Sequence, residues 1–385
     1  MAPNLVGTAA LFLTEATSED DSVSLTAKSV HHHPQTKIAK QPCRSIKPKY
    51  RWKVVWRNVF AFVYLHVAGL YGLYLLLFVC SWKTFFWTYL FAFIAGQGIT
   101  AGAHRLWAHR SYKAKLPLRI ILMICQTMAF QNHIYEWVRD HRVHHKFTDT
   151  DADPHNAKRG FFFSHIGWLM LRKHQDVMLK GKKVDMSDLA EDPVIQFQKK
   201  FYLLLVPIMC FAVPSLVPWY FWNENGWVSW YTASIFRYCL SLNFTWLVNS
   251  AAHIWGTKPY DKTIGPAENM GVALAAFGEG WHNYHHVFPW DYKAAELGNY
   301  RLNHTTMVID FFSKIGWAYD LKTTSVEMIE KRAKRTGDGS RTIKNFEGDV
   351  TDHHHHHEGI WGWGDMDMKL EDVQDVKVYN RLNEN

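Results

Sequence analysis

Four long apolar runs constrain this chain more than any other feature of its sequence. They are Val59–Cys80, Thr84–Ala103, Phe201–Trp222 and Trp230–Ile254. A helix needs about 20 apolar residues to cross the hydrocarbon core of a bilayer, and each run reaches that length. The second run, "FFWTYLFAFIAGQGITAGA", has almost no polar stripe, whereas the surface helices of soluble proteins normally have one. Buried helices of a soluble protein are therefore the weaker interpretation, and we expect four transmembrane helices.

Two of the runs carry residues that are unusual in a membrane span. The third run contains Pro207, Pro214 and Pro218, which should kink the helix without preventing it from spanning. The fourth contains Arg237 near one end, where we expect the guanidinium to snorkel toward water. A further apolar piece, residues 120–130, is too short to span, and we expect it at the membrane interface or in the protein core.

The connections between the runs predict the topology. "SWK" joins the first two runs and "NENG" lies between the last two, so both are tight hairpins on one side. The segment 37–57, just before and into the first run, holds eight Lys and Arg, and the positive-inside rule places it in the cytosol. Four spans then return the chain to that side. We therefore expect both termini in the cytosol, together with a helical cap formed by residues 104–200 and 255–335.

The predicted membrane domain, residues 49–335, has polar sequence at both ends. Residues 1–48 are typical of a disordered cytosolic tail and show no cleavable signal peptide, and residues 336–385 are predicted to be a polar C-terminal tail. The runs His31–His33 and His353–His357 lie in these ends, and the sequence assigns them no role. The five cysteines are scattered without a CxxC pair, which argues against a disulfide framework or a zinc–thiolate site.

Nine of the 23 histidines stand in short motifs that all fall on the cytosolic side of this topology. The stretches "HRVHH" and "HNYHH" share the spacing HxxHH, and residues i, i+3 and i+4 of a helix lie on one face. Each stretch should therefore direct three imidazoles to one point, or to two neighbouring points. The nine are His104, His109, His141, His144, His145, His253, His282, His285 and His286.

These histidines favour a metal centre. Imidazole suits Zn, Cu, Fe and Ni, and nine neutral ligands are too many for one ion, so two metals are implied. His104 and His109 stand five residues apart and would diverge on a straight helix, so they fit two neighbouring metals better than one. Asn249 and His253 are i and i+4 and share a helix face. Ordinary surface or core histidines would explain one HxxHH, but they explain three clusters on one side poorly.

The motifs "HRLWAHR", "HRVHH" and "HNYHH", with "DADPHN", "RGFFFSHIGW" and "NSAAHIWG", closely resemble the membrane-bound acyl-CoA desaturases of the stearoyl-CoA desaturase group. The resemblance covers about residues 50–335, and "KPYDK" and "AKRTGDGS" resemble the insect, moth-like branch. It implies an all-α membrane protein with four transmembrane helices, whose cytosolic helical cap holds a di-iron centre. It makes the nine histidines iron ligands, with Asn249 acting through water.

The chemistry of that family explains why a metal is needed. An unactivated methylene offers no acid–base handle, so its oxidation requires a metal site supplied with O₂ and two electrons, while the protein supplies orientation. The resemblance implies a C16–C18 fatty acyl-CoA substrate, two Fe, cytochrome b5 as electron donor with an NAD(P)H-dependent reductase upstream, and the endoplasmic reticulum membrane. The net charge of +8 suits an acidic partner, although solvated surface charge explains it equally well. No nucleic-acid partner is expected.

The resemblance also assigns substrate contacts. Cationic side chains can pair with phosphates, although surface charge would explain any one of them. The CoA head would meet Asn58, Arg139, Asp140, Arg172 and Lys173. The bent acyl chain beside the irons would meet Gln131, Asn132, Trp137, Thr245 and Trp246. We expect the tunnel to end in the second run, where Ala92 or Gly96 would set the chain length.

Several alternatives stay open at this point. Δ9 is the leading regioselectivity, but Δ11 or another position differs only by a shift of about 1 Å in tunnel geometry. A membrane di-iron fatty acyl hydroxylase would use the same oxidant, and a metal-storing membrane protein would need neither tunnel nor CoA contacts. His66 is expected to be a satisfied helix histidine. His155 and His165 lack the shared spacing and are left out of the site.

Overall fold

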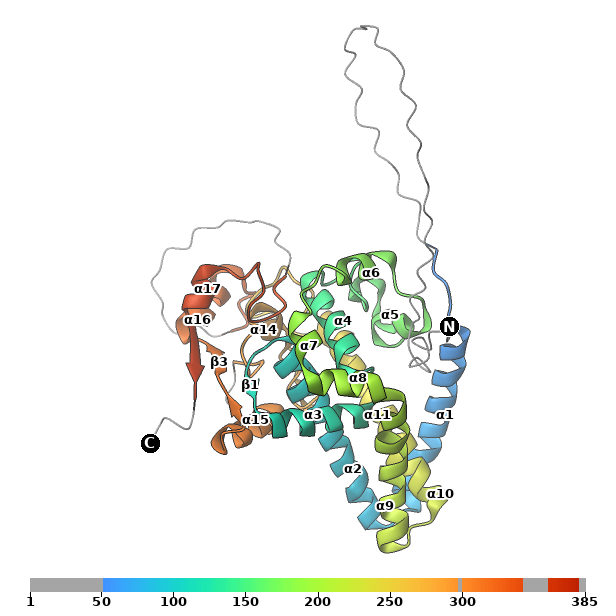
Figure 1. Ribbon diagram of the computed structural model, residues 1–385. Coiled ribbons are helices and arrows are strands. Elements are labelled where there is room, and N and C mark those ends of the chain that lie inside the picture. The colour runs from blue at the N-terminus through green and yellow to red at the C-terminus, as the bar shows by residue number, and fades with distance from the viewer. Residues whose placement is uncertain (1–50, 297–299, 342–358, 381–385) are drawn as a thin grey trace, which may run out of the picture.

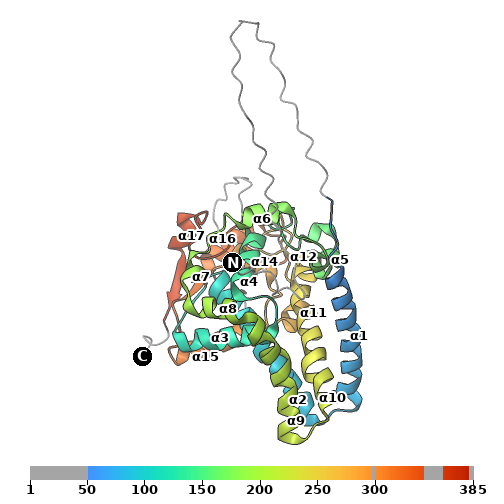
Figure 2. The same cartoon turned by 45° about the vertical axis from the view of Figure 1, so that its right-hand side comes forward.

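The computed structural model describes residues 51–296, 300–341 and 359–380. The predicted tail 1–48 and both histidine runs lie outside these residues. Figures 1 and 2 show long helices extending from one side of a group of shorter elements. We call the long helices the stem and the shorter elements the cap. The stem comprises α1 (Trp56–Phe78), α2 (Trp82–Gln97), α8 (Pro193–Val206), η4 (Pro207–Ala212), α9 (Val213–Trp222), α10 (Gly226–Ser229), η5 (Trp230–Phe236) and α11 (Arg237–Asn249).

All four apolar runs are helical. Within the described residues, two helices are long and apolar enough to span a membrane: Trp56–Phe78 and the combined helix Pro193–Trp222. The second run is divided, because α2 passes directly into the π-helix η1 (Gly98–Ala108), and the fourth is divided among η5, α11 and the short helix α12 (Ala251–Ile254). Helix formation in the four runs is therefore confirmed, whereas four membrane spans remain a prediction.

The third run deviates from α-helical geometry where the prolines begin. The π-helix η4 starts at Pro207, which has no backbone N–H to donate to the preceding turn. A π-turn widens the helix by one residue and is a common way to absorb such an irregularity. The predicted irregularity in this run is thus present as a π-segment.

Arg237 does not reach water, and the prediction that it snorkels is wrong. Its side chain is fully buried. The guanidinium donates to three backbone carbonyls, those of Cys210 at 2.6 Å, Met128 at 3.1 Å and Ala233 at 3.2 Å. These bonds satisfy the buried group from three different helices, which is how an interior cation is tolerated.

The two hairpins meet at the end of the stem that is far from the cap. The carboxylate of Glu224 accepts hydrogen bonds from the Ser81 backbone N–H (3.0 Å), from the Ser81 hydroxyl (2.7 Å) and from the Thr84 hydroxyl (2.5 Å). Nearer the middle of α1, His66 bonds the carbonyl of Phe62 and the side chain of Asn243. His66 is therefore a satisfied helix histidine, as expected.

The cap is mostly helical, but two short antiparallel sheets make the all-α prediction incomplete. In one sheet β1 (Lys113–Ala114) pairs with β2 (Ala318–Tyr319), and in the other β3 (Leu321–Thr324) pairs with β4 (Val376–Tyr379). The cap helices are α3 (Leu116–Ala129), α4 (Ile134–Lys146), η2 (Ala157–Arg159), α5 (Phe161–His165), η3 (Gly167–Met170), α6 (Gln175–Gly181), α7 (Ser187–Glu191), α12 (Ala251–Ile254), α13 (Met270–Ala275), α14 (His282–Val287), η6 (Tyr300–Leu302), α15 (His304–Lys314), α16 (Val326–Thr336) and α17 (Leu370–Gln374).

The apolar piece 120–130 lies in α3, at the junction of stem and cap (Figure 1). Leu118 and Leu122 of this helix are buried against Ile134 and Val138 of α4. The core that they form fixes α4, and with it the first HxxHH stretch. Residues 359–380 also belong to the fold, since β4 pairs with β3 and Trp361 is buried. The folded unit therefore extends past the predicted boundary at residue 335.

Candidate metal centre

Both HxxHH stretches are helical, as the spacing predicted. "HRVHH" ends α4 and "HNYHH" begins α14. His253 lies on the short helix α12, which follows the last helix of the stem. The local reason in each case is the i, i+3, i+4 periodicity, which turns the three imidazoles of a stretch toward one side.

The first pair of histidines is brought together by a π-helix. The N–H of His109 donates to the carbonyl of His104, 3.1 Å away, which is an i→i+5 bond. Residues five apart therefore lie on one face here, and the two ring centroids are 4.7 Å apart. The expectation that His104 and His109 diverge toward two metals is wrong, because it assumed an α-helix.

The nine predicted histidines converge in two groups, within each of which the ligand nitrogens all lie within 4.8 Å of one another. Neighbouring Nε2 atoms are 2.9–3.3 Å apart. We call them the five-histidine group and the four-histidine group. The first contains His104, His109, His141, His145 and His285, and the second contains His144, His253, His282 and His286.

The environment favours the neutral form of six of these imidazoles. Burial, and then the neighbouring imidazoles, lower the pKa of six of them well below 6.5: His109, His141, His145, His282, His285 and His286. Neutral imidazole is the form that binds a metal. These six histidines, which include members of both groups, are therefore in the form that a metal requires.

The protonation pattern leaves lone pairs facing one another. The Nδ1 of His144 lies 2.9 Å from a carboxylate oxygen of Asp153, and the Nδ1 of His109 bonds the carbonyl of Trp361. Since these oxygens only accept, Nδ1 carries the proton and Nε2 presents a lone pair. Each of these lone pairs points at another imidazole nitrogen, 2.9 or 3.3 Å away in a buried site, where a metal cation would accept it. The residues present therefore fit bound metal ions.

One cavity adjoins the histidines, and a second shares part of its wall. The first is lined by residues of α4, of α11 and of the segments near them. They include His141, Trp137, Trp246, Asn132 and Asn249. The second, of about 520 Å³, is lined by apolar residues of α2, α11 and α13 and includes Ala92 and Gly96. This volume lies within the usual range for small-molecule pockets. Gln131 and Thr245 line both cavities and are joined by a hydrogen bond of 2.8 Å.

Comparison with known proteins identifies this arrangement. The family model described as fatty acid desaturase matches residues 80–321. The chain is 57% identical over 383 residues to an acyl-CoA Delta-9 desaturase of Acheta domesticus, with 99% of each chain covered. It is 52% identical to an acyl-CoA Delta-12 desaturase of Tribolium castaneum (93% of this chain, 99% of that one) and 52% identical to an acyl-CoA Delta(11) desaturase of Spodoptera littoralis (86% and 91%).

The chain belongs to the fatty acid desaturase family. The resemblance found in the histidine motifs is thereby confirmed, and the chain is an oxidoreductase of that family. The relatives differ in the position at which they act, so membership does not decide the regioselectivity.

Most of the predicted substrate residues of this desaturase lie on the cavity walls. Gln131, Asn132, Trp137, Asp140, Thr245 and Trp246 line the first cavity, and Ala92 lines the second. Asn58 differs. It is fully buried, and its Nδ2 donates to the carbonyl of Leu169 at 2.8 Å. The structure therefore places Asn58 behind the cavity wall rather than on it.

The charged residues predicted for the CoA head gather on α4 and the segment after η3. Lys173 lies 2.5 Å from Asp140 and 3.3 Å from Glu136, and Arg139 lies 3.2 Å from both of these carboxylates. Burial raises the pKa of Asp140, but the two cations outweigh it and hold that pKa below 3.8. Arg172 is next to Lys173 and forms a backbone bond to Lys53 at 2.9 Å.

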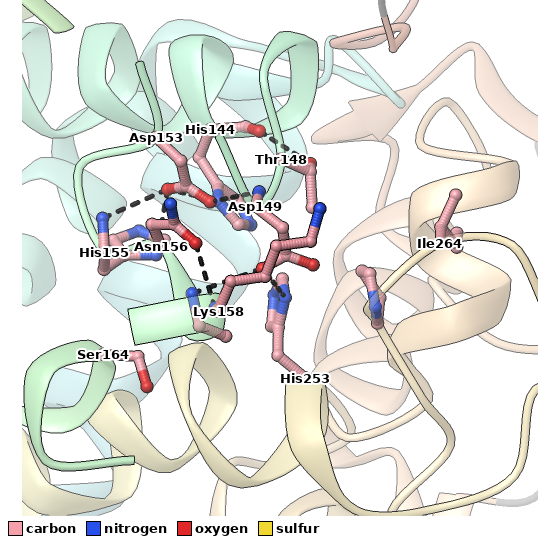
Figure 3. A network of polar contacts seen from close by, with 12 residues as sticks. His144, Thr148, Asp149, Asp153, His155, Asn156, Lys158, Ser164, His253 and Ile264 are labelled. Atoms are coloured by element: carbon pink, nitrogen blue, oxygen red, sulfur yellow. Dashed lines mark hydrogen bonds and ion pairs between the residues drawn. The ribbon is translucent and has the colours of Figure 1, made fainter. Parts of the chain in front are cut away.

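Several residues that orient the ligands were missed in the sequence. One oxygen of Glu279 is 2.9 Å from the Nδ1 of His104, and the other accepts from Arg105 at 2.8 Å. Figure 3 shows Asp153 between His144 and His155, and Asp149 near His253. His155, excluded for its spacing, therefore touches the site through Asp153. The acidic stretch after "HRVHH" could have indicated the two aspartates. No sequence pattern indicates Glu279 or Trp361.

Proposed function

We propose that this desaturase inserts a cis double bond at Δ9 of saturated C16–C18 fatty acyl-CoA, using O₂ and two electrons from cytochrome b5. The proposal includes the endoplasmic reticulum membrane, four spans and both termini in the cytosol. One observation carries it: His141, a member of the five-histidine group, and Trp137, which stacks on it, line a cavity that shares Gln131 and Thr245 with the second cavity at α2. Storage of metal would need no such cavity.

The two histidine groups would each hold one iron ion, and Asn249 would act on one of them through water. When bound, iron supplies the oxidising power that takes two hydrogens from the chain, with O₂ reduced to two waters by those hydrogens, two electrons and two protons. The protein fixes the ligands. Glu279 and Asp153 hold His104 and His144 from behind, and such outer contacts orient metal-bound imidazoles.

The remaining residues would position the substrate. The acyl chain would enter the first cavity, pass between Trp137 and Trp246, and turn at the Gln131–Thr245 hydrogen bond into the second cavity. Lys173 and Arg139 would meet the anionic head group. Holding the chain in a fixed bend sets which methylene faces the irons, because reactivity depends on placement within about 1 Å.

The test is expression in a yeast that lacks its own Δ9 desaturase, with double-bond positions mapped by mass spectrometry of derivatised fatty acids. Growth rescue with Δ9 products is expected. Δ11 or Δ12 products would retain the desaturase and overturn the regioselectivity. Hydroxy acids would favour the hydroxylase alternative. Iron-loaded protein without any fatty acid product would contradict the proposed activity. The His174→Asn variant is a suitable control, since His174 caps α6 outside both histidine groups and Asn caps helices equally well.

A further inference from the structure

A segment near the C-terminus lies against the end of the metal site. We call residues 359–368 the strap. The N–H of Gly359 donates to the carbonyl of Lys146 at 3.1 Å, and the Lys146 ammonium pairs with Asp365 at 2.9 Å. Lys146 directly follows His145 at the end of α4. The strap is therefore fastened to the helix that carries the first HxxHH stretch.

The strap also contacts His109 directly. The N–H of Trp363 donates to the carbonyl of His109 at 2.9 Å, and the carbonyl of Trp361 accepts from the His109 ring at Nδ1. A carbonyl oxygen has no proton to give, so this bond requires the Nδ1–H tautomer. That tautomer leaves the Nε2 of His109 free to face His141, whose Nε2 is 2.9 Å away.

The ring of Trp361 anchors the strap. It is 2% exposed, and the guanidinium groups of Arg142 and Arg110 lie 4.1 and 4.8 Å from its centroid. Arg142 in turn bonds Asp188 with two nitrogens, at 2.8 and 3.0 Å. Cation–π contacts are stronger when the cation and the ring are shielded from water. Trp361 is thus held by residues of the same elements that carry the ligands.

The backbone of the strap passes too close to His109 for side chains. Gly362 has φ of +153°, and a Cβ there would stand 2.5 Å from the carbonyl oxygen of His109. A Cβ at Gly359 would overlap the carbonyl of His145. Both glycines lie where the strap crosses members of the five-histidine group, so its approach to this group is built into the sequence.

We propose that the strap is a positioning element for the five-histidine group: the Trp361 carbonyl fixes the tautomer of His109, and metal binding and strap docking stabilise each other. This inference rests on the proposed metal site. Loss of a contact behind a ligand typically weakens metal binding about 10–100-fold. Coupling between two binding events is reciprocal, so metal should also hold the strap in place. The contacts described all lead to the five-histidine group, and the effect should be confined to the metal there.

The experiment uses the full chain, purified in detergent and loaded with ⁵⁷Fe. Trp361→Ala removes the anchor, Trp361→Phe keeps an aromatic ring, and Met366→Ala is the control because Met366 is 96% exposed on the same segment. His282→Ala is a reference variant that shows the spectrum expected when the iron of the four-histidine group is lost. Retention of iron under chelator challenge and the Mössbauer spectrum are measured. Trp361→Ala should bind one of the two irons about 10–100-fold more weakly. Trp361→Phe and Met366→Ala should retain both irons as the unaltered protein does.

Limited proteolysis of the unaltered protein, with and without iron, gives a test that does not depend on a variant folding. Iron should protect the strap from cleavage. Equal cleavage in both states, or full retention of both irons by Trp361→Ala while His282→Ala loses one, would overturn the inference and leave the proposed function intact. Failure of the unaltered protein to bind iron at all would instead contradict the proposed function. A general loss of both irons and of folding in Trp361→Ala, without protection by iron, would make the strap merely structural.

Discussion

Each histidine of the two groups has two ring nitrogens with different tasks. One faces the other ligands, and in three of these histidines the other lies against an acceptor, which fixes both the tautomer and the ring orientation. His104 uses Glu279, His144 uses Asp153 and His109 uses Trp361. The acceptors therefore matter to the site almost as much as the ligands do.

Glu279→Gln is expected to weaken iron binding by about 10–100-fold. The carboxylate balances the buried Arg105, and burial acts against its charge, but Arg105 and then His104 hold the pKa of Glu279 below 4.5. An amide removes that charge from behind His104. Iron retention under chelator challenge measures the effect, with Glu330→Gln, a partly exposed glutamate, as control. Equal retention in both variants would contradict the role given to Glu279.

The metal-free protein should lose stability as the pH falls below about 6.5. The six histidines whose pKa is lowered bind protons less readily when folded than when unfolded, since unfolding restores a pKa near 6.5. Their contribution is fully present above 6.5 and declines as the pH drops toward the lowered values. Protons also compete with metal for these nitrogens. Melting temperature and iron content between pH 8 and 5 test this; flat profiles would refute it.

Ala92→Phe should shift product formation toward shorter chains. Ala92 lines the second cavity opposite the bend at Gln131 and Thr245, and a phenyl ring would fill its far part. Competition between C14, C16 and C18 acyl-CoA in one assay measures the preference. Val63→Phe, on an exposed position of α1, controls for added bulk. An unchanged ratio of products would exclude Ala92 from the end of the tunnel.

At the level of elements, the described part of the chain differs from the expected regular helices at three π-helical segments, η1, η4 and η5. The HxxHH stretches could be predicted because i, i+3 and i+4 contacts are local. The convergence of His104 and His109 could not, because a π-turn depends on packing that no short motif encodes. The prediction that Arg237 reaches water was wrong for the same reason, because its three carbonyl partners come from segments up to 109 residues away. Spacing predicts the face of an element, and packing decides its geometry.

Gly98→Ala tests the element on which His104 depends. Gly98 begins η1, and a Cβ there would overlap the backbone of Cys125 and Gln126 in α3. Overpacking against backbone costs about 1–3 kcal/mol or more, so the melting temperature and iron content should both fall. Gly226→Ala is the matched control, because its Cβ would meet Trp219 at an ordinary 3.6 Å. If both variants melt alike, the close packing of η1 on α3 is not needed.

For the whole molecule, the sequence predicted a mostly helical fold, and long helices beside a group of shorter, mostly helical elements are present (Figure 2). Four spans and a cytosolic cap stay predictions. The nine histidines of the two groups could be predicted because they lie in short motifs. The groups behind them could not, since Arg105 and Glu279 are 174 residues apart and His109 and Trp361 are 252 apart. A polar C-terminal segment with few apolar residues gives no local indication that it docks on the cap.

The proposed topology predicts that both termini face the cytosol. α1 begins at the cap end, and the hairpins joined by Glu224 lie at the opposite end (Figure 1). In sealed microsomes, added protease should remove tags from both termini, while a tag inserted at residues 223–226 should be protected until detergent is added. Protection of either terminus would show that the number of spans is not four.

The position of the strap near the end of the chain also orders the events of biosynthesis. His286, the last ligand, leaves the ribosome well before Trp361, so a nascent chain holds all nine histidines while the acceptor for His109 is still being translated. The metal site therefore cannot be completed until the strap has been synthesised. A premature stop codon between His286 and Trp361 would yield a protein that has all nine histidines but lacks the acceptor for His109. Inspection of the histidine motifs alone would not detect that loss.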